Sequence, residues 1–268
     1  MKYSPHEYQE YAIRFIEENP VAAVLLDMGM GKTSIVLTAI VELMYEWFEV
    51  NRVLIIGPLR VARTTWPEES KKWDHMKGVR YSVMVGSAAE RRAALEADAD
   101  IYIINRENVP WLVDQCGSAF NFDMVVIDEL SSFKSWQTKR FKALMKVRPF
   151  VSRIVGLTGT PSSNGLMDLF AEFKVLDMGK RLGRFIGQYR ECYFRADKMN
   201  GPVVYSYRLI PGAEEAIYEK ISDITISMKA ADYLNMPELV STEHKVYLDE
   251  KEKHQYKEMK EQLVMQLP

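Results

Sequence analysis

The sequence has few of the residues from which disulfide-held or metal-held scaffolds are built. It contains two cysteines, Cys116 and Cys192, which lie far apart and outside any Cys-x-x-Cys pattern, and its four histidines are scattered. This composition argues against a disulfide framework and a zinc site. A reducing cytoplasm fits it best, and that is the location we expect.

Long apolar runs and an excess of charge are also missing. The longest continuous apolar run, Val21–Leu26, is far too short to span a membrane, and the polar N-terminus lacks the apolar core of a signal peptide. We therefore expect no membrane partner. The formal net charge is only −2 over 268 residues, so a nucleic-acid partner must be argued from local patches.

What the sequence does contain is a regular alternation of short apolar runs with helical stretches. Apolar runs of strand length occupy residues 21–26, 52–57, 81–85, 101–104, 124–127 and 154–157. Helical or polar stretches separate them. This alternation predicts an α/β fold with a parallel β-sheet covered by helices on both faces.

The pattern changes after about residue 178. Continuous apolar runs vanish, and residues 213–233 look helical. Further on, Asp249 and Glu252 have the spacing of a capping box, and Tyr256 and Met259 follow at helical spacing. We therefore expect a mainly helical C-terminal part.

The apolar run at Val21–Leu26 leads directly into a glycine-rich turn, Asp-Met-Gly-Met-Gly-Lys-Thr. Glycines allow the backbone to fold tightly and to aim N–H groups at phosphate oxygens, and the helix that follows adds its positive end. The lysine would reach the β- and γ-phosphates and the threonine hydroxyl would coordinate Mg²⁺. The predicted ATP-binding residues are Met28, Gly29, Met30, Gly31, Lys32, Thr33 and Ser34.

One position departs from the usual phosphate-loop pattern. The glycine that normally stands five residues before the last glycine is replaced by Leu26, and the additional Gly29 partly compensates. An ordinary glycine turn before a helix is the simpler alternative. The strand–turn–helix order favours the phosphate loop.

A second motif consists of two acidic residues at the end of an apolar run. Asp128 and Glu129 directly follow residues 124–127. Phosphoryl transfer to water needs such a pair: Asp128 would hold Mg²⁺, and Glu129 would orient and deprotonate the attacking water. Lys32, Asp128 and Glu129 are therefore the predicted catalytic residues.

Together these motifs resemble the first RecA-like lobe of a superfamily-two helicase from the Swi/Snf-like branch of DNA translocases. The matching segments are residues 27–33, 54–73, 128–131, 157–161 with Asn164, 168–170, 175–177 and 185–194. The resemblance implies that Gln9 reads adenine. It also implies that Thr158, Gly159 and Thr160 couple the nucleotide state to DNA. The compact length and the Asp-Glu-Leu-Ser variant of the acidic motif resemble phage or prophage versions.

The resemblance further implies a second lobe that this sequence does not contain. We expect residues 1–177 to form the core of the first lobe, 178–245 a family-specific, mainly helical extension, and 246–268 the start of a connection to the absent lobe. In the family that lobe supplies arginines to the γ-phosphate, so the chain alone should bind ATP but hydrolyse it slowly. Leu130 and Ser131 replace the usual Ala-His, and coupling would instead involve Ser131 or Ser132.

Local charge points to a DNA-binding surface. Residues 134–153 hold seven basic and no acidic residues, and residues 52–92 hold nine basic and four acidic ones. Our candidates for contacts with DNA phosphates are Arg60, Arg63, Thr64 and Lys134. Such contacts would position double-stranded DNA of any sequence without reading its bases. A solvated helix face is the alternative for residues 139–146.

Two other functions fit part of the pattern. A small-molecule kinase or nucleotide switch would share the phosphate loop but would lack the Thr-Gly-Thr-Pro segment about 30 residues after the acidic pair. A catalytically weak nucleotide-dependent module that binds DNA or protein would not need Lys32, Asp128 and Glu129 intact. The sequence therefore favours a DNA-dependent ATPase of the helicase or double-stranded DNA translocase type, with ATP and Mg²⁺ at its site.

Overall fold

A computed structural model describes residues 1–159, 165–201, 203–233 and 248–262 of the chain. The chain divides into two compact units, Met1–Leu234 and Asn235–Pro268. In the second unit the described part contains α11 (Glu250–Gln262). Its predicted capping box is confirmed, because the amide of Glu252 donates to Asp249 Oδ1 at 2.7 Å and the amide of Asp249 donates to Glu252 Oε2 at 2.9 Å.

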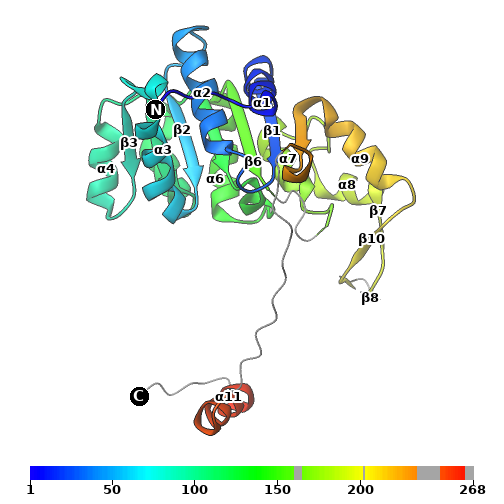
Figure 1. The fold of residues 1–268 in the computed structure, drawn as a ribbon. Coiled ribbons are helices and arrows are strands. Elements are labelled where there is room, and N and C mark those ends of the chain that lie inside the picture. The colour runs from blue at the N-terminus through cyan, green and yellow to red at the C-terminus, as the bar shows by residue number, and fades with distance from the viewer. Residues whose placement is uncertain (160–164, 202, 234–247, 263–268) are drawn as a thin grey trace. The chain divides into compact units, whose positions relative to one another are not determined.

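The first unit is built on one seven-stranded sheet (Figure 1). Its strands are β1 (Val21–Leu26), β2 (Val53–Gly57), β3 (Tyr81–Met84), β4 (Ile101–Asn105), β5 (Met124–Asp128), β6 (Arg153–Thr158) and β11 (Thr225–Met228). Their order is β11-β1-β6-β5-β2-β4-β3, and every neighbouring pair is parallel. The predicted parallel sheet is therefore confirmed.

Helices cover both faces of this sheet, which explains why most of its strands are apolar on both sides. Alternate strand residues, such as Val24 and Leu25, belong to two different hydrophobic clusters. On one face the cover consists of α1 (Glu7–Glu18), α2 (Lys32–Tyr45) and α3 (Trp66–Lys72). The other face is covered by α5 (Val109–Cys116), α6 (Lys139–Val147), α7 (Leu169–Asp177), α8 (Ile186–Tyr193) and α9 (Ala213–Ile221). At the edge of the sheet, α4 (Ala88–Glu96) precedes β4.

Beyond α7 the chain mixes helices with short strands. Two small antiparallel pairs, β7 (Phe194–Ala196) with β10 (Tyr207–Leu209) and β8 (Met199–Asn200) with β9 (Val203–Val204), lie between α8 and α9. The expectation that residues 213–233 are helical is wrong in part. Helices α9 and α10 (Ala230–Tyr233) flank β11, which joins the main sheet beside β1.

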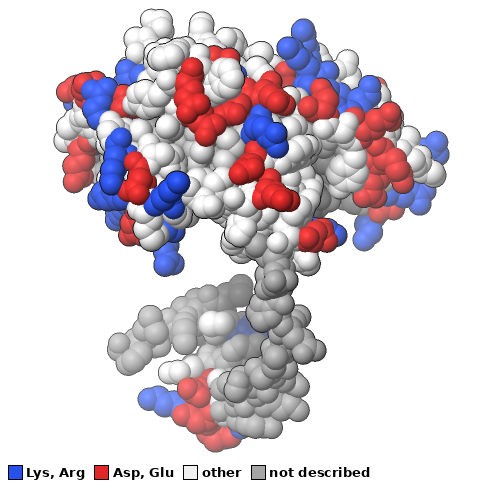
Figure 2. All heavy atoms as spheres, turned by 45° about the horizontal axis from the view of Figure 1, so that its top comes forward, with Lys and Arg blue, Asp and Glu red and all other residues white. Residues whose placement is uncertain are grey.

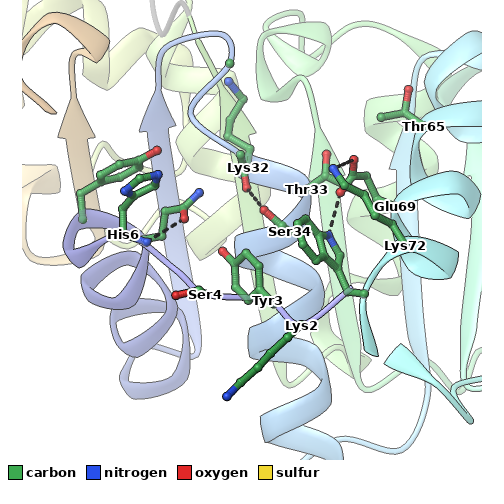
Figure 3. A pocket seen from close by; sticks show the side chains of 15 residues that line it. Lys2, Tyr3, Ser4, His6, Lys32, Thr33, Ser34, Thr65, Glu69 and Lys72 are labelled. Carbon is green, nitrogen blue, oxygen red and sulfur yellow. Dashed lines mark hydrogen bonds and ion pairs between the residues drawn. The ribbon is translucent and has the colours of Figure 1, made fainter. Parts of the chain in front are cut away.

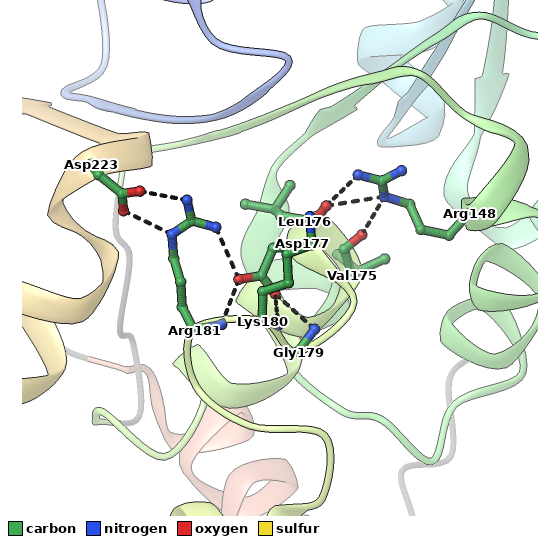
Figure 4. Close-up of polar contacts among 8 residues, drawn as sticks. All are labelled: Arg148, Val175, Leu176, Asp177, Gly179, Lys180, Arg181 and Asp223. Atoms are coloured by element: carbon green, nitrogen blue, oxygen red, sulfur yellow. Dashed lines mark hydrogen bonds and ion pairs between the residues drawn. The ribbon is translucent and has the colours of Figure 1, made fainter.

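A network of arginines and carboxylates, in which Arg148 and Asp177 are buried, ties this later part of the chain to the core (Figure 4). Arg148 donates to the carbonyl oxygens of Val175 at 3.1 Å and Leu176 at 3.0 Å. Nearby, Asp177 accepts from Arg181, which also pairs with Asp223 in the turn before β11. These bonds hold the C-terminal end of α7 and the segment after α9 together.

The same bonds correct our count of surface charge. Arg148 and Arg153 were counted in the basic stretch 134–153, but both are buried, at 3% and 5% exposure. Arg153 donates to the carbonyl oxygen of Ile16 at 2.8 Å and pairs with Glu49 at 2.5 Å. Both guanidinium groups are therefore structural, since carbonyl groups and, for Arg153, the carboxylate of Glu49 occupy most of their donors.

Candidate active site

The parallel strands bring their carboxyl ends to one edge of the sheet, where ligands bind in folds of this kind. The segment after β1 forms the phosphate loop, the segment after β5 carries Asp128 and Glu129, and the segment after β6 carries Gly159. β6 lies between β1 and β5 in the sheet. The three predicted motifs therefore converge, although they lie far apart in the sequence.

Two glycines give the phosphate loop its shape. Gly29 and Gly31 have φ values of +81° and +77°, in the left-handed region that favours glycine. Gly31 also has no room for a side chain, because a Cβ there would lie 2.5 Å from Nε2 of Gln9 and 3.1 Å from Oγ of Ser34. Helix α2 begins at the next residue, so its positive end faces the loop.

Lys32 is held by the loop itself. Its Nζ donates to the carbonyl oxygens of Leu26 at 2.6 Å and Asp27 at 3.0 Å. Burial lowers the pKa of this amine, and the nearby carboxylates of Asp128, Glu129 and Asp27 oppose that shift. Lys32 is therefore close to both predicted acidic residues, and an anion bound at the loop would compete with the two carbonyls for its ammonium group.

Gln9 is buried against the phosphate loop. Its Nε2 donates to the carbonyl oxygen of Met30 at 3.2 Å, and its Oε1 accepts from the amide of His6 at 3.0 Å. The hydroxyl of Tyr8 donates to the same carbonyl of Met30 at 3.2 Å. Helix α1 thus holds the loop through the bonds that Tyr8 and Gln9 donate to Met30.

A pocket of about 690 Å³ opens beside the loop. Its lining includes Gln9, Gly29, Gly31, Lys32, Thr33, Ser34, the N-terminal segment at Lys2 and Tyr3, and Glu69, Lys72 and Trp73 near α3 (Figure 3). Two predicted ligands do not offer their side chains to it. Met28 is 85% exposed and Met30 is fully buried, so these two residues could contribute only backbone groups near the phosphates.

Asp128 lies at the end of β5 and is bonded to a residue that the sequence did not single out. Its Oδ2 accepts from the indole N–H of Trp66 at 2.9 Å, and Trp66 is fully buried. Burial raises the pKa of Asp128, and the bond from Trp66 acts in the opposite direction. The indole therefore favours the ionised form of the carboxylate, which is the form that binds Mg²⁺.

Glu129 has an unusual backbone and two hydroxyl partners. Its φ of +68° is uncommon for a residue with a side chain, and such conformations cluster at functional sites. Thr158 Oγ1 donates to Glu129 Oε1 at 2.9 Å, and Ser131 Oγ donates to the same oxygen. Both bonds leave Oε2 for another partner. The hydroxyl of Ser131 thus lies next to the carboxylate of Glu129, while the Oγ of Ser132 has no hydrogen-bond partner among the described residues.

The segment after β6 lies against the phosphate loop. A Cβ on Gly159 would lie 3.4 Å from the carbonyl oxygen of Leu26 and 3.8 Å from Nζ of Lys32. Together with Thr158, this residue links the loop to Glu129. Thr160, the third predicted coupling residue, lies outside the described residues, as does Asn164.

Three of the predicted DNA contacts share one exposed segment. Arg60, Arg63 and Thr64 are exposed and lie on or next to a π-helical turn, Val61–Thr65, that follows β2. Such turns are rare in proteins, but those that occur often lie at functional sites. The turn leads directly into α3, whose first residue is Trp66. The fourth candidate, Lys134, forms an ion pair with Asp168 at 3.7 Å.

Glu172 on α7 is a buried carboxyl group that sequence reasoning did not find. It is 1% exposed, and among the described residues neither carboxyl oxygen has a hydrogen-bond partner. Burial, followed by the carboxylates of Asp168 and Glu129, raises its pKa to about 8, against the opposing effect of Lys134. Glu172 therefore carries a proton at neutral pH close to the predicted water-activating residue.

No helix in the described part of the chain is long and apolar enough to cross a membrane.

Comparison with known proteins gives matches over nearly the whole chain. The SNF2-related domain matches residues 8–267. The chain is 35% identical to protein p41 of Acyrthosiphon pisum secondary endosymbiont phage 1, over 99% of this chain and 59% of p41. It is 31% identical to the mouse (Mus musculus) DNA excision repair protein ERCC-6-like, over 81% of this chain and 18% of that protein. The chain thus spans about three fifths of the phage relative and less than a fifth of the mouse one.

The fold matches a solved ATPase core. The SWI2/SNF2 ATPase core of Sulfolobus solfataricus in complex with dsDNA superposes with a TM-score of 0.69 at 22% identity. The match covers 86% of this chain and 45% of the archaeal chain. The RecA-like fold that the motifs implied is therefore confirmed.

Proposed function

Because the chain belongs to the SNF2-related domain family, we propose that it is the ATP-binding lobe of a DNA-dependent ATPase of the helicase or double-stranded DNA translocase type. The observation that carries this proposal is the meeting of Lys32, Asp128, Glu129 and Thr158 at one edge of the sheet. These are the groups that hydrolysis of a nucleotide requires: a cation for phosphates, a metal ligand and a base for water.

The residues present fit a bound Mg²⁺–ATP. Gly29 has no atom within 4 Å of an added Cβ, so the loop is open where phosphates would lie, and the pocket beside it is lined by Thr33 and Lys32. One hydroxyl from Thr33 and one carboxylate from Asp128 are a suitable pair of oxygen ligands for Mg²⁺, which takes most of its remaining ligands from phosphates and water. When bound, the ion neutralises charge on the β- and γ-phosphates.

Each residue then has a separate task. Lys32 leaves the carbonyls of Leu26 and Asp27 and binds the phosphates, since a charged acceptor is stronger than a neutral carbonyl. Glu129 orients a water through Oε2 and accepts its proton as the water attacks the γ-phosphorus, while the bond from that phosphorus to the β–γ bridging oxygen breaks and ADP leaves. Thr158 and Ser131 fix the other oxygen of that carboxylate, which sets its direction.

Contact with the nucleic acid is assigned to the segment after β2. Arg60 and Arg63 are exposed there, and phosphate contacts by arginine position a duplex without reading its sequence. The archaeal ATPase core with the same fold was solved with double-stranded DNA, which supports a duplex as the partner. Trp66 follows directly and bonds Asp128, so movement of this segment reaches the metal ligand.

The test compares nucleotide binding and turnover in three variants. Lys32→Ala should weaken binding of a fluorescent ATP analogue strongly. Glu129→Gln should keep binding and lower single-turnover hydrolysis by about 10²-fold or more, as expected for a lost general base. Lys146→Ala, on the exposed face of α6, is the matched control and should change neither. Nucleotide binding that survives Lys32→Ala unchanged would rule out the assigned site. DNA binding with no measurable hydrolysis would instead support a nucleotide-dependent binding module.

A further inference from the structure

The chain returns to the phosphate loop about 200 residues after leaving it. β11 lies beside β1 with Met228 opposite Leu26, the last residue before the loop. The contact continues beyond the strands. The amide of Asp27 donates to the carbonyl oxygen of Met228 at 3.4 Å, and the carboxylate oxygen Oδ2 of Asp27 accepts from the amide of Ala230 at 2.9 Å.

Asp27 is bonded on three sides. Its amide bonds to Met228 and its carboxylate to Ala230, while its carbonyl oxygen accepts from Lys32 Nζ at 3.0 Å. Met228 and Ala230 are 8% and 6% exposed, so water competes little for these bonds. One residue therefore joins the lysine that would bind phosphate to the segment that follows β11.

A second contact connects the same two regions. The hydroxyl of Tyr8 donates to the carbonyl oxygen of Met30 inside the phosphate loop, and the ring of Tyr8 packs on Tyr233 at a centroid distance of 5.4 Å. A pocket of about 530 Å³, lined by Tyr8, Tyr11, β11 and Tyr233, lies beside this contact. The segment at residues 230–233 thus has room to change its packing.

We infer that Asp27 is a positioning residue that ties the phosphate loop to residues 228–233, so that nucleotide bound at Lys32 restricts the movement of that segment. The inference rests on the proposed nucleotide function. Phosphates would draw Lys32 away from the carbonyl of Asp27 and would fix the amides of the loop. A fixed Asp27 holds the amide of Ala230 for more of the time, and residues 230–233 become more ordered.

The experiment measures amide hydrogen exchange over residues 225–233 in the full chain, with and without a non-hydrolysable ATP analogue and Mg²⁺. Three variants are compared. Asp27→Ala removes the acceptor for Ala230, and Asp27→Asn keeps an oxygen that can accept the same bond. Asp123→Ala is the matched control, because Asp123 also accepts from backbone amides, those of Asn51 at 2.8 Å and Arg52 at 3.0 Å, at the other end of the strands.

The nucleotide should slow exchange at residues 228–233 in the wild type, in Asp27→Asn and in Asp123→Ala. In Asp27→Ala exchange there should be about fivefold to tenfold faster, as expected for a lost hydrogen bond, and the nucleotide should no longer slow it. A merely structural role would change exchange equally with and without the nucleotide, and would overturn the inference.

Binding of the analogue, followed by fluorescence anisotropy, separates the two possible failures. If the analogue binds the wild type but leaves exchange at residues 228–233 unchanged, the inference is wrong and the proposed function stands. If the analogue does not bind, the proposed function and the inference both fail. If Asp27→Ala does not fold, unchanged exchange at residues 228–233 in the wild type with bound analogue still overturns the inference.

Discussion

At the scale of single residues, the site depends on buried groups whose partners are few and specific. Trp66 gives Asp128 an indole N–H, and Glu172 sits near Glu129 with a proton of its own. Neither residue would touch the nucleotide phosphates. Trp66 acts on the ionisation of Asp128, whereas Glu172 has a raised pKa of its own, and each makes a prediction that separates these effects from simple packing.

Replacing Trp66 by Phe should weaken the metal site. The ring still fills most of the space, but Asp128 loses the donor that lowers its pKa, so the proton competes better with Mg²⁺. We expect the Mg²⁺ concentration for half-maximal binding of an ATP analogue to rise about threefold to tenfold, and to rise further as the pH falls, in line with a lost hydrogen bond to a charged group.

The matched control for that measurement is Trp111→Phe, a similar loss of an indole on α5. It should leave the Mg²⁺ dependence at its wild-type value. A Trp66→Phe protein whose Mg²⁺ dependence matches the wild type at every pH would show that the indole serves packing alone.

Replacing Glu172 by Gln should change how stability depends on pH. The folded-state pKa of about 8 lies above the value of 4.5 for an unperturbed glutamate, so between these values the folded chain binds more protons than the unfolded one. The free energy of unfolding therefore falls as the pH rises from 4.5 to 8. Glutamine stays neutral and removes this loss.

The Gln variant should consequently exceed the wild type in stability at pH 9 by about 2 to 4 kcal/mol and lose that advantage near pH 5. Urea unfolding at several pH values measures the difference. Glu17, whose pKa is also raised to about 8 by burial, contributes the same slope to both proteins and cancels. Parallel curves for wild type and variant would mean that Glu172 is ionised in the folded chain.

At the scale of secondary-structure elements, the π-helical turn at Val61–Thr65 is the feature best placed to link DNA with the nucleotide site. It presents Arg60 and Arg63 to solvent and ends at Trp66, the partner of Asp128. The basic face of α6, with Lys139 and Lys142 exposed, is the competing surface. Both signs of charge are spread over the face shown in Figure 2, so a local cluster has to supply the phosphate contacts.

The double variant Arg60→Ala/Arg63→Ala should therefore bind duplex DNA more weakly. The slope of log affinity against log salt should fall by about 2, since each phosphate contact contributes about 0.9. Fluorescence anisotropy with a labelled duplex over a salt series measures this slope. Lys139→Ala/Lys142→Ala is the control. If the slope of log affinity against log salt falls more in that variant, the DNA contacts α6 and not the turn at Val61–Thr65.

Most of the sheet could be predicted from the sequence because its strands are largely buried and mainly apolar. β11 could not, because half of its four residues are polar: Thr225 is partly buried and Ser227 is exposed between buried Ile226 and Met228. The phosphate loop could be predicted because its glycines, lysine and threonine lie within seven consecutive residues. The hydrogen bond from the amide of Ala230 to Asp27 joins positions 203 residues apart, so no local sequence pattern predicts it.

Surface charge was the property that could be predicted least well from the sequence. Arg148 and Arg153 counted as surface charges in the sequence, but the fold buries both against carbonyl groups of α7 and α1. A guanidinium group can be satisfied by main-chain oxygens that appear only when helices end beside it. The boundaries predicted at residues 177 and 245 stay predictions, while the described chain continues past the first of them into the main sheet through β11.

At the scale of the whole molecule, we propose that the lobe contains one side of an active site. In this proposal Lys32, Asp128 and Glu129 supply the cation, the metal ligand and the base, and the family resemblance implies that arginines on the γ-phosphate come from a second lobe. This chain spans 59% of the length of phage protein p41 and 45% of the archaeal ATPase core. The two lobes would contribute differently. Binding of ATP depends mainly on the phosphate loop of the first lobe, whereas the rate of hydrolysis depends on stabilisation of charge in the transition state, to which arginines of the second lobe would add.

The chain by itself should therefore bind ATP and turn it over slowly. An arginine that reaches the transferring phosphate is worth about 10³-fold or more in rate, so single-turnover hydrolysis by this chain should fall short of that of a two-lobed ATPase of the same family by at least about that factor. Glu129→Gln should lower even the slow rate, which shows that the residual activity comes from this site and not from a contaminant. Robust hydrolysis that rises on addition of duplex DNA to this chain alone would mean that the lobe completes its own active site, and that the γ-phosphate finds its cation among residues already present.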